Sequence, residues 1–310
     1  MITKKEIMVL GSGISGLGSV MLAKKMDIDV FLSEGNIIDE DTKKTLRNEH
    51  IDFEENGHDP KKLIESDEII ISPGISFNKL KKSYPEIDSR KFISEIEFAS
   101  RFTDAFIIAV TGSNGKTTTA TLIYHILKSA GLNVGLAGNI GVSFASSVCD
   151  YSYDYYVLEV SSFQLDHSIT FKPNISVITN ISPDHLDRYD EDFDLYTLSK
   201  YSIVKNQKPN DFFVYNNDCN VTKKIFSRVQ IKSKSISFST KQNRGLKHSI
   251  YTNKNNIISS INKEKFMLST DKIQIKGIHN IQNSMAAISV AQILKISNQK
   301  IKESLKTFKS

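Results

Sequence analysis

Cysteine is scarce in this sequence, with Cys149 and Cys219 the only two among 310 residues. They form no Cys-x-x-Cys pair and have no metal-ligand spacing, so a reducing compartment fits best. Long hydrophobic runs are missing as well, because no stretch approaches the roughly 20 apolar residues that a membrane-spanning helix needs. The N-terminus has a short apolar run followed by glycines, unlike a secretory signal. We therefore expect a cytoplasmic protein without a membrane span.

A strong charge of one sign is also lacking. Lys and Arg number 40 against 35 Asp and Glu, and the resulting net charge of +5 is spread along the chain. No basic block of the kind that binds nucleic acid is present, so no nucleic-acid partner is expected. The length is sufficient for two domains with a large core, and neither repeats nor low-complexity linkers interrupt it.

What the chain does contain is a phosphate-binding pattern. An apolar run, Phe106 to Val110, is followed by a glycine-rich loop and then by a segment with helical spacing. We expect the loop to bind a nucleoside triphosphate through Gly112, Ser113, Asn114, Gly115, Lys116, Thr117 and Thr118. Loop N–H groups and the helix N-terminus would face the anion, Lys116 would neutralise it, and the Thr117 hydroxyl could ligate Mg²⁺. The strict pattern requires glycine where Val110 stands, so a glycine turn with an incidental lysine is the alternative.

A second glycine pattern opens the chain. A short strand, Glu6 to Leu10, leads into the Gly-x-Gly-x-x-Gly sequence Gly11 to Gly16, a helical segment and a second strand, Asp29 to Leu32. This order is typical of dinucleotide-binding folds, and Glu34 lies where those folds place a ribose-contacting acid. NAD is the generic ligand. The lysine-bearing loop of the second domain favours a nucleoside triphosphate instead.

Alternating strands and helices predict an α/β fold with a parallel sheet covered on both faces. We place a domain boundary near residue 94, giving a Rossmann-like domain over 1–94 and a P-loop ATPase-like α/β domain over 95–310. Six short β-prone pieces between Phe212 and Lys276, from Phe212–Tyr215 to Lys272–Ile275, predict antiparallel hairpins that form a small added sheet. Two helices, Ile278 to Leu294 and Lys300 to Phe308, follow.

Three further residues could carry chemistry. Glu159 ends an apolar strand at the sheet edge where ligands bind, so it either shares a metal with Thr117 or pairs with a lysine. His185 follows the next core strand in a proline-containing loop, where packing and a functional role are both plausible. Lys200, by residue type alone, is most simply a solvated helix lysine.

Several motifs together resemble the Mur ligases of peptidoglycan synthesis. They are Thr111–Thr117, Gly138-Asn139-Ile140-Gly141, Leu158–Leu165, Asp184–Tyr189, Ser72-Pro73-Gly74-Ile75 and Gly277–Asn283. Their order matches the family from Gly11 to Asn283. The sequence Ser161-Ser162-Phe163-Gln164-Leu165 resembles the corresponding motif in the branch of the family that adds D-glutamate to UDP-N-acetylmuramoyl-L-alanine.

This resemblance implies roles for individual residues. Lys116, Asn280 and Asn283 would contact ATP, while Thr117 and Glu159 would hold a first Mg²⁺. His185 would join a second Mg²⁺ site together with Lys200, which matches a lysine that CO₂ converts to a carbamate in the family. Lys116, His185 and Lys200 would be catalytic. Ile14, Ser15, Ser72, Asn139 and His185 would bind the UDP-linked substrate. The family's uridine contacts are not matched at Ser33-Glu34-Gly35.

The implied reaction phosphorylates the terminal alanine carboxylate of UDP-N-acetylmuramoyl-L-alanine with ATP, and D-glutamate then attacks the acyl phosphate. Family members continue into a third, amino-acid-binding domain, which we expect to be absent here, so no D-glutamate contacts are named. A monomer is expected. The alternatives are a truncated, catalytically incomplete UDP-substrate and ATP-binding protein, a nicotinamide-dependent oxidoreductase, and a folylpolyglutamate-synthase-like ligase, which would leave the first glycine loop unexplained.

Overall fold

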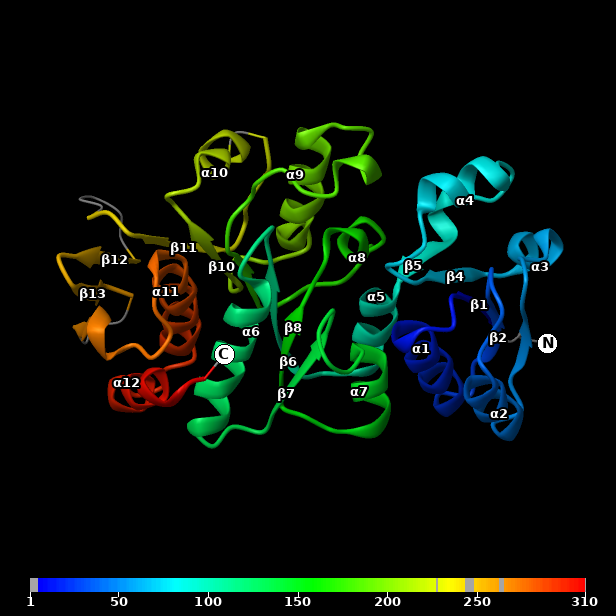
Figure 1. Ribbon diagram of the computed structural model, residues 1–310, viewed down its shortest axis with the longest axis horizontal. Helices are drawn as coiled ribbons and strands as arrows, with labels where there is room; N and C mark the ends of the chain where they lie inside the picture. The colour runs from blue at the N-terminus through cyan, green and yellow to red at the C-terminus, as the bar shows by residue number, and fades with distance from the viewer. Residues whose placement is uncertain (1–4, 227, 243–247, 262–264, 310) are drawn as a thin grey trace. The chain divides into compact units, whose positions relative to one another are not determined.

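The computed structural model describes residues 5–226, 228–242, 248–261 and 265–309 (Figure 1). Residues 1–4, part of the N-terminus compared with a secretory signal, lie outside them. Contacts group the chain into two compact units. The first combines Met1–Thr103 with Gly141–Ser152 and Phe163–Phe171; the second combines Asp104–Ile140, Tyr153–Ser162 and Lys172–Ser310. Two segments that follow residue 95 in the chain thus belong by their contacts to the first unit, while the boundary at residue 94 stays a prediction.

The first unit is built around a parallel sheet of five strands in the order β3-β2-β1-β4-β5. This confirms the predicted α/β fold with a Rossmann-like beginning. Its elements are β1 (Glu6–Leu10), α1 (Ile14–Lys25), β2 (Asp29–Ser33), α2 (Glu40–Asn48), β3 (Asp52–Glu54), α3 (Pro60–Glu65), β4 (Glu68–Ile71), α4 (Phe77–Ser83), β5 (Phe92–Ser94), α5 (Glu95–Ala99) and α7 (Phe144–Asp150). A further short helix, α8 (Ser162–Asp166), begins in the last residue of a second-unit segment.

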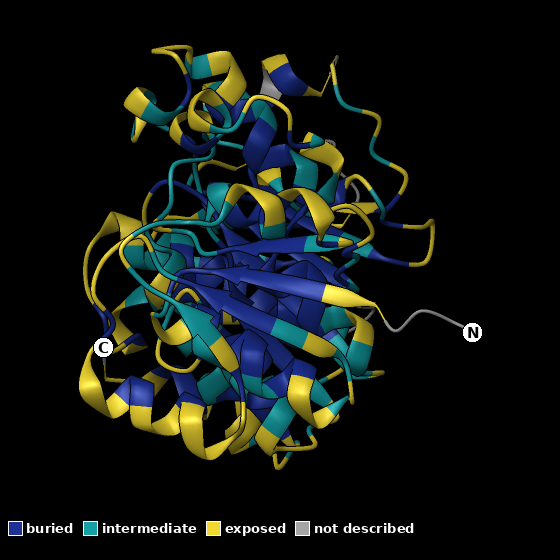
Figure 2. Cartoon of the chain, turned by 90° about the vertical axis from the view of Figure 1, so that its right-hand side faces the viewer, coloured by how far each residue is buried: buried dark blue, intermediate teal, exposed yellow. Residues whose placement is uncertain are grey.

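Both faces of this sheet are covered because its strands are apolar on both sides. One core cluster joins Met8 and Ile69 of the strands to Leu63 of α3 and Leu80 of α4. The alternate residues Ile7 and Val9 point to the opposite face, which α1 covers. In Figure 2 the strands are largely buried, and exposed residues lie on the outer sides of the helices. The pattern agrees with the parallel sheet covered on both faces that the alternation of strands and helices predicted.

Helix α1 packs closely on α7 at a glycine. A Cβ atom added to Gly18 would lie 2.2 Å from the Ser143 hydroxyl oxygen and 2.5 Å from that of Ser146. Ser143 is the N-cap of α7, and its hydroxyl accepts the Ser146 N–H. The helix that follows the first glycine loop therefore contacts a segment 125 residues further along the chain.

Two buried carboxylates on α5 hold the two later segments of the first unit. The Glu95 carboxylate accepts the Ala145 N–H at 2.6 Å, at the start of α7. Glu97 accepts the N–H groups of Ile169, Thr170 and Phe171 at 2.7 to 3.0 Å. Each carboxylate thus accepts hydrogen bonds from backbone N–H groups of a segment outside residues 1–103, and these N–H groups need no backbone acceptor.

The second unit contains a nine-stranded sheet in the order β14-β13-β12-β11-β10-β9-β6-β8-β7. Its elements are β6 (Phe106–Thr111), α6 (Lys116–Ser129), β7 (Val134–Gly138), β8 (Tyr155–Glu159), β9 (Ile175–Ile178), α9 (Phe193–Tyr201), β10 (Phe212–Asn216), α10 (Asn220–Ile225), β11 (Lys234–Ser239), β12 (Ser249–Asn253), β13 (Asn256–Ser259), β14 (Phe266–Ser269), α11 (Ile278–Ile293) and α12 (Asn298–Thr307). Short 3₁₀ turns, among them Leu186–Arg188 and Thr270–Lys272, lie between these elements. Helices α6 and α11 pack side by side, and both contribute to the core cluster beneath the parallel strands.

The added antiparallel strands are fewer than expected. β12, β13 and β14 pair antiparallel, as predicted, but β10 and β11 extend the sheet in parallel. The expectation of antiparallel hairpins is therefore wrong for β10 and β11, because α10 makes a crossover connection between these strands. The expected strand Lys272–Ile275 is also wrong, since a 3₁₀ turn ends at Lys272 and the chain bends at Gln274 and Ile275.

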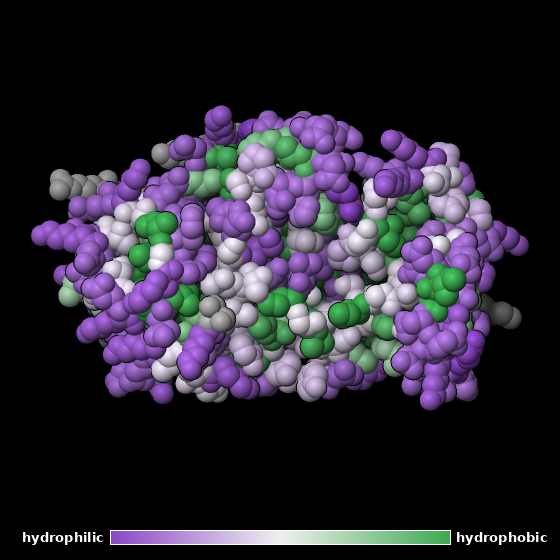
Figure 3. All heavy atoms as spheres, viewed as in Figure 1, coloured by the Kyte–Doolittle hydropathy of each residue, from purple (hydrophilic) through white to green (hydrophobic). Residues whose placement is uncertain are grey.

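On the face shown in Figure 3, hydrophobic residues form small groups among hydrophilic ones. None of the helices in the described part of the chain is long and apolar enough to cross a membrane.

Candidate active site

The predicted phosphate loop lies between β6 and α6. At two of its glycines, neighbouring atoms leave no room for a side chain. Gly112 has φ +146°, and a Cβ there would lie 2.0 Å from the Thr179 hydroxyl oxygen. Gly115 has φ +78°, and a Cβ there would lie 2.5 Å from Oδ1 of Asn283. Side chains at these positions would strain the backbone and collide with the loop's neighbours. The buried Val110, which stands where the strict pattern has glycine, is the penultimate residue of β6.

Lys116 is folded back onto its own loop. Its Nζ donates to the carbonyl oxygens of Gly112 at 3.0 Å and Ser113 at 2.9 Å. The first N–H groups of α6, from Lys116 to Thr118, have no partner within the helix because of its geometry. A lysine and a helix N-terminus at one point make this loop suited to an anion such as a phosphate.

Glu159, Thr117 and Asn139 meet at the ends of neighbouring strands. Strand register places Glu159 of β8 beside Val110 of β6 and Gly138 of β7. The Thr117 hydroxyl donates to Oε2 of Glu159 at 2.7 Å, and Nδ2 of Asn139 donates to Oε1 at 3.2 Å. Only 3% of Glu159 is exposed, so these two donors compensate much of the cost of burying a carboxylate.

This group fits a magnesium ion. A carboxylate and a hydroxyl are hard oxygen donors, and Mg²⁺ typically takes one or two protein ligands together with substrate phosphates. Within the described residues, no group of three or more His, Cys, Asp or Glu side chains could hold a metal. The ligand set is therefore suited to an ion that arrives with a nucleotide, rather than to one held entirely by protein.

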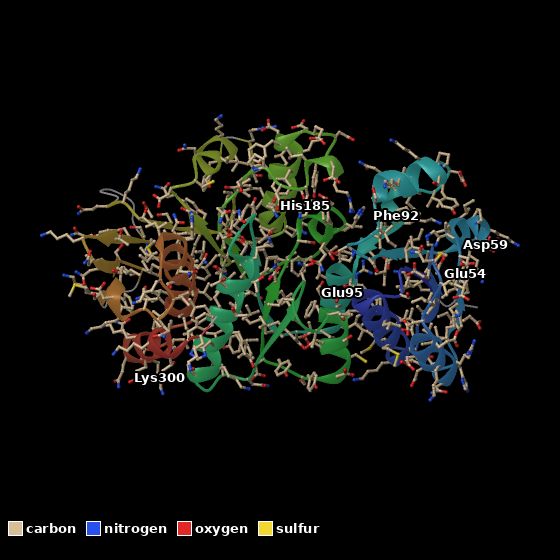
Figure 4. The ribbon with its side chains drawn as sticks, viewed as in Figure 1. Glu54, Asp59, Phe92, Glu95, His185 and Lys300 are labelled. Carbon is tan, nitrogen blue, oxygen red and sulfur yellow. The ribbon has the colours of Figure 1, made fainter. Side chains whose placement is uncertain are left out.

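His185 lies on the loop after β9, in a left-handed backbone conformation with φ 51° (Figure 4). Its Nε2 is 3.6 Å from Oδ2 of Asp184, and its side chain is 57% exposed. The exposed imidazole is accessible to a ligand. The loop that carries it is hydrogen-bonded to the phosphate loop, because the backbone of Ser182 contacts the Ser113 hydroxyl. Its roles in substrate and metal binding stay predictions.

Lys200 is buried, in contrast to the solvated lysine that its residue type suggests. Only 2% of it is exposed, and its Nζ lies 4.8 Å from the centre of the Tyr196 ring, one helical turn earlier on α9. A cation over an aromatic face is a favourable contact. The Tyr196 hydroxyl in turn lies 2.9 Å from the Ser113 hydroxyl oxygen, which connects α9 to the phosphate loop.

Asn283 and Asn280 form one contact pair on the first turns of α11. Nδ2 of Asn283 donates to Oδ1 of Asn280 at 3.3 Å, and Asn283 lies against Gly115 of the phosphate loop. The structure thus brings Asn283 to the loop that was predicted to bind the same nucleotide.

The remaining candidates belong to the first unit. Ser72 lies against the first glycine loop, since a Cβ at Gly11 would be 2.8 Å from its hydroxyl oxygen. That oxygen is buried and has no hydrogen-bond partner among the residues that the structure describes. Ile14 is 68% exposed at the start of α1, and the Ser15 carbonyl accepts the Ser19 hydroxyl. Their contact with a UDP group stays a prediction.

Glu34 is fixed at the same end of the sheet. One carboxylate oxygen accepts the N–H and hydroxyl of Ser12, and the other accepts the Asn36 N–H. Burial by itself would raise the pKa of Glu34, but these hydrogen bonds outweigh it and the pKa lies below its ordinary value. A carboxylate therefore occupies the position where the family's uridine contacts were not matched.

Sequence reasoning missed the residues that brace the phosphate loop. Thr179 donates to the Asn114 carbonyl at 2.6 Å, and the Asn180 side chain both donates to that carbonyl and accepts the Asn114 N–H. Both residues follow β9 at the carboxyl edge of the sheet, and that position was the available signal. For Tyr196 the available signal was its place four residues before Lys200, one helical turn away.

Comparison with known proteins gives two family matches. Residues 110–291 match the Mur ligase middle domain, and residues 6–79 match the MurD N-terminal domain. Proteins named UDP-N-acetylmuramoylalanine–D-glutamate ligase are similar over 98 to 99% of the chain. The protein from Christiangramia forsetii is 41% identical, that from Bacteroides thetaiotaomicron 40% and that from Porphyromonas gingivalis 38%, and the chain covers 68% of the length of each.

Solved structures share the fold. The chain matches a UDP-N-acetylmuramate:L-alanyl-gamma-D-glutamyl-meso-diaminopimelate ligase from Neisseria meningitides with a TM-score of 0.63 at 20% identity, covering 99% of each chain. It matches the UDP-N-acetylmuramate-alanine ligase MurC from Thermotoga maritima with a TM-score of 0.56 at 19% identity, covering 98% of this chain and 68% of that one. The family matches include most of both units, and the similarity to the 41% identical relative covers 98% of the chain, so the chain belongs to the Mur ligase family.

Proposed function

We propose that the chain acts in an ATP-dependent ligase that adds D-glutamate to UDP-N-acetylmuramoyl-L-alanine during peptidoglycan synthesis. The observation that carries the proposal is the convergence of Thr117, Glu159 and Asn139 beside a lysine-bearing phosphate loop. The names of the 38 to 41% identical relatives supply the substrate and the amino acid. The low cysteine content still favours a cytoplasmic location.

The geometry is suited to phosphoryl transfer to a carboxylate. Lys116 would move from its loop carbonyls to the phosphates, and the α6 N-terminus would hold the same anion. The γ-phosphoryl group passes from ATP to the terminal alanine carboxylate, and ADP leaves. The D-glutamate amine then attacks the carbonyl carbon of the acyl phosphate, so that an amide forms and phosphate leaves. The protein's part is positioning and charge stabilisation.

Magnesium would be held by Thr117 and Glu159, with a second ion near His185 and Lys200. Bound there, the ions would offset the repulsion between a triphosphate and a carboxylate. A carbamate on Lys200 belongs to the same proposal, because it would replace a buried ammonium with an oxygen ligand. The main support for this part is the donor chemistry of the residues.

The test is calorimetric binding followed by turnover. We expect this chain to bind ATP with MgCl₂ and, separately, UDP-N-acetylmuramoyl-L-alanine. We expect a protein extended to the relatives' length to release ADP when D-glutamate is added but not with L-glutamate. Binding of neither compound would contradict the proposal, as would an extended protein without turnover. NADH binding in a fluorescence titration would favour the oxidoreductase alternative.

A further inference from the structure

The Ser113 side chain lies inside the second unit rather than at the surface of the phosphate loop. Only 6% of the residue is exposed. Its hydroxyl oxygen contacts three groups: the Ser182 carbonyl at 2.8 Å, the Ser182 N–H at 2.9 Å and the Tyr196 hydroxyl at 2.9 Å. The partners come from two elements far away in the chain, the loop after β9 and helix α9.

The hydrogen positions in this group follow from simple counting. A serine hydroxyl has one hydrogen to donate and two lone pairs that accept. The Ser182 carbonyl can only accept, so it takes the Ser113 hydrogen, and the Ser182 N–H can only donate, so it takes one lone pair. Tyr196 must then donate to the second lone pair. All three hydrogen-bonding positions of Ser113 are therefore used within the protein.

The backbone of Ser113 is engaged in the same way. Its N–H donates to the Asn180 carbonyl at 2.9 Å, and the next N–H, of Asn114, donates to Oδ1 of Asn180 at 3.1 Å. With both its hydroxyl and its N–H bonded within the protein, Ser113 is poorly placed to bind phosphate. The N–H groups at the start of α6 are better placed for that task.

The partners of Ser113 lie close to residues of the proposed active site, in the chain or in space. Ser182 precedes His185 by three residues in the same loop. Tyr196 lies one turn before Lys200 on the same face of α9, with the Lys200 ammonium 4.8 Å from its ring. Lys116 bonds the Ser113 carbonyl.

We propose that Ser113 is a positioning residue whose hydroxyl joins the phosphate loop, the His185 loop and the Lys200 helix. This inference rests on the proposed function for its purpose, because it assumes that the three elements serve one reaction. The hydroxyl fixes them relative to one another within the second unit. Its loss disturbs all three together.

Amide hydrogen exchange tests the junction without any ligand. In Ser113→Ala, exchange should rise about tenfold or more in peptides covering 179–189 and 193–204. In Tyr196→Phe, which keeps the ring, it should rise in 193–204 alone. The double variant should exchange like Ser113→Ala in 193–204, because the shared hydrogen bond is already gone.

The matched control is Ser289→Ala, which removes a buried hydroxyl that, among the described residues, bonds only the Met285 carbonyl of its own helix. It should leave both peptides at wild-type exchange. The inference is overturned if Ser113→Ala leaves 179–189 unchanged, if it raises exchange no more than Ser289→Ala does, or if the Tyr196→Phe effect adds fully to it. Should Ser113→Ala fail to fold, exchange in the peptide 193–204 of Tyr196→Phe still tests whether the bond to Ser113 holds α9. Unchanged exchange there would contradict that connection.

A second measurement separates this inference from the proposed function. ATP affinity is measured with MgCl₂ and with EDTA. Ser113→Ala should reduce the affinity for ATP in MgCl₂ about tenfold more than it reduces the affinity in EDTA, whereas a purely structural defect would lower both by the same factor. If the wild-type chain binds no ATP, the proposed function fails while the exchange data still decide whether Ser113 is a junction.

Discussion

At the scale of single residues, Glu95 and Glu97 show how hydrogen-bond donors decide the behaviour of a buried carboxylate. Both are completely buried on α5. Burial raises the pKa of Glu95 to about 7, although the Ala145 and Phe144 N–H groups and Gln164 act in the opposite direction. Burial would also raise the pKa of Glu97, but Thr170, Phe171 and the charge of Arg101 outweigh it and lower that pKa. The same residue type thus opposes folding at neutral pH in one position and favours it in the other.

The pKa of Glu95 predicts a measurable pH dependence. Because the folded-state pKa is raised from 4.5 to about 7, the unfolded chain ionises first, so Glu95 lowers stability as pH rises through this range. Glu95→Gln should remove the loss, which is at most about 3 kcal/mol. The measurement is the free energy of unfolding in urea at pH 4.5, 6 and 8. The free energy of unfolding of the variant should increase relative to that of the wild-type chain as pH increases. A difference that does not change with pH would contradict the raised pKa of Glu95.

Glu159→Gln tests the magnesium site with little change of shape. The amide keeps one acceptor but loses the negative charge, so the affinity for ATP in MgCl₂ should fall about 10- to 100-fold, as for other altered metal sites. Affinity in EDTA should stay nearly constant. Glu303→Gln, on the exposed part of α12, is the control and should bind like the wild-type chain. Equal losses with and without magnesium would show that Glu159 has a structural role only.

At the scale of elements, local motifs were easier to predict than the contacts between them. The phosphate loop was recognisable because its glycines, lysine and helix are contiguous in the chain. Strands β10 and β11 were placed in antiparallel hairpins because spacing does not show that α10 crosses between them. The bonds from Ser113 to Ser182 and Tyr196 extend over 69 and 83 residues, and no spacing rule detects them.

The contact between α1 and α7 predicts a specific weakness at Gly18. Gly18→Ala would bring a methyl group within 2.2 Å of the Ser143 hydroxyl, so we expect a loss of about 1 to 3 kcal/mol in the stability of the first unit. Gly13→Ala is the control, since its Cβ would meet no atom of the described residues within 4 Å and its φ is −72°. Urea unfolding followed by circular dichroism measures both. Equal stability of the two variants would contradict close packing at Gly18.

At the scale of the whole molecule, each unit has its own sheet and its own core cluster. A ligand that binds one unit should therefore protect that unit most. ATP with MgCl₂ at about 100 times its dissociation constant adds about 2.7 kcal/mol, enough to slow exchange of core amides in β6 to β9 about 100-fold. Amides in β1 to β5 should change less. UDP-N-acetylmuramoyl-L-alanine should protect β1 to β5 in return. Uniform protection by both ligands would show that the two units open together.

The first unit is assembled from three separate stretches of chain, and this sets an order for its folding during synthesis. The five strands of its sheet are complete once residue 94 has left the ribosome. The donors that satisfy Glu95 and Glu97 are not made until Ala145 and then Phe171 have been added. Until then α5 carries two acidic side chains without these partners, and α1 has an uncovered face at Gly18. The first unit to be started is thus finished only after the phosphate loop has been synthesised, so chaperone binding to nascent chains should persist until about residue 171 has emerged.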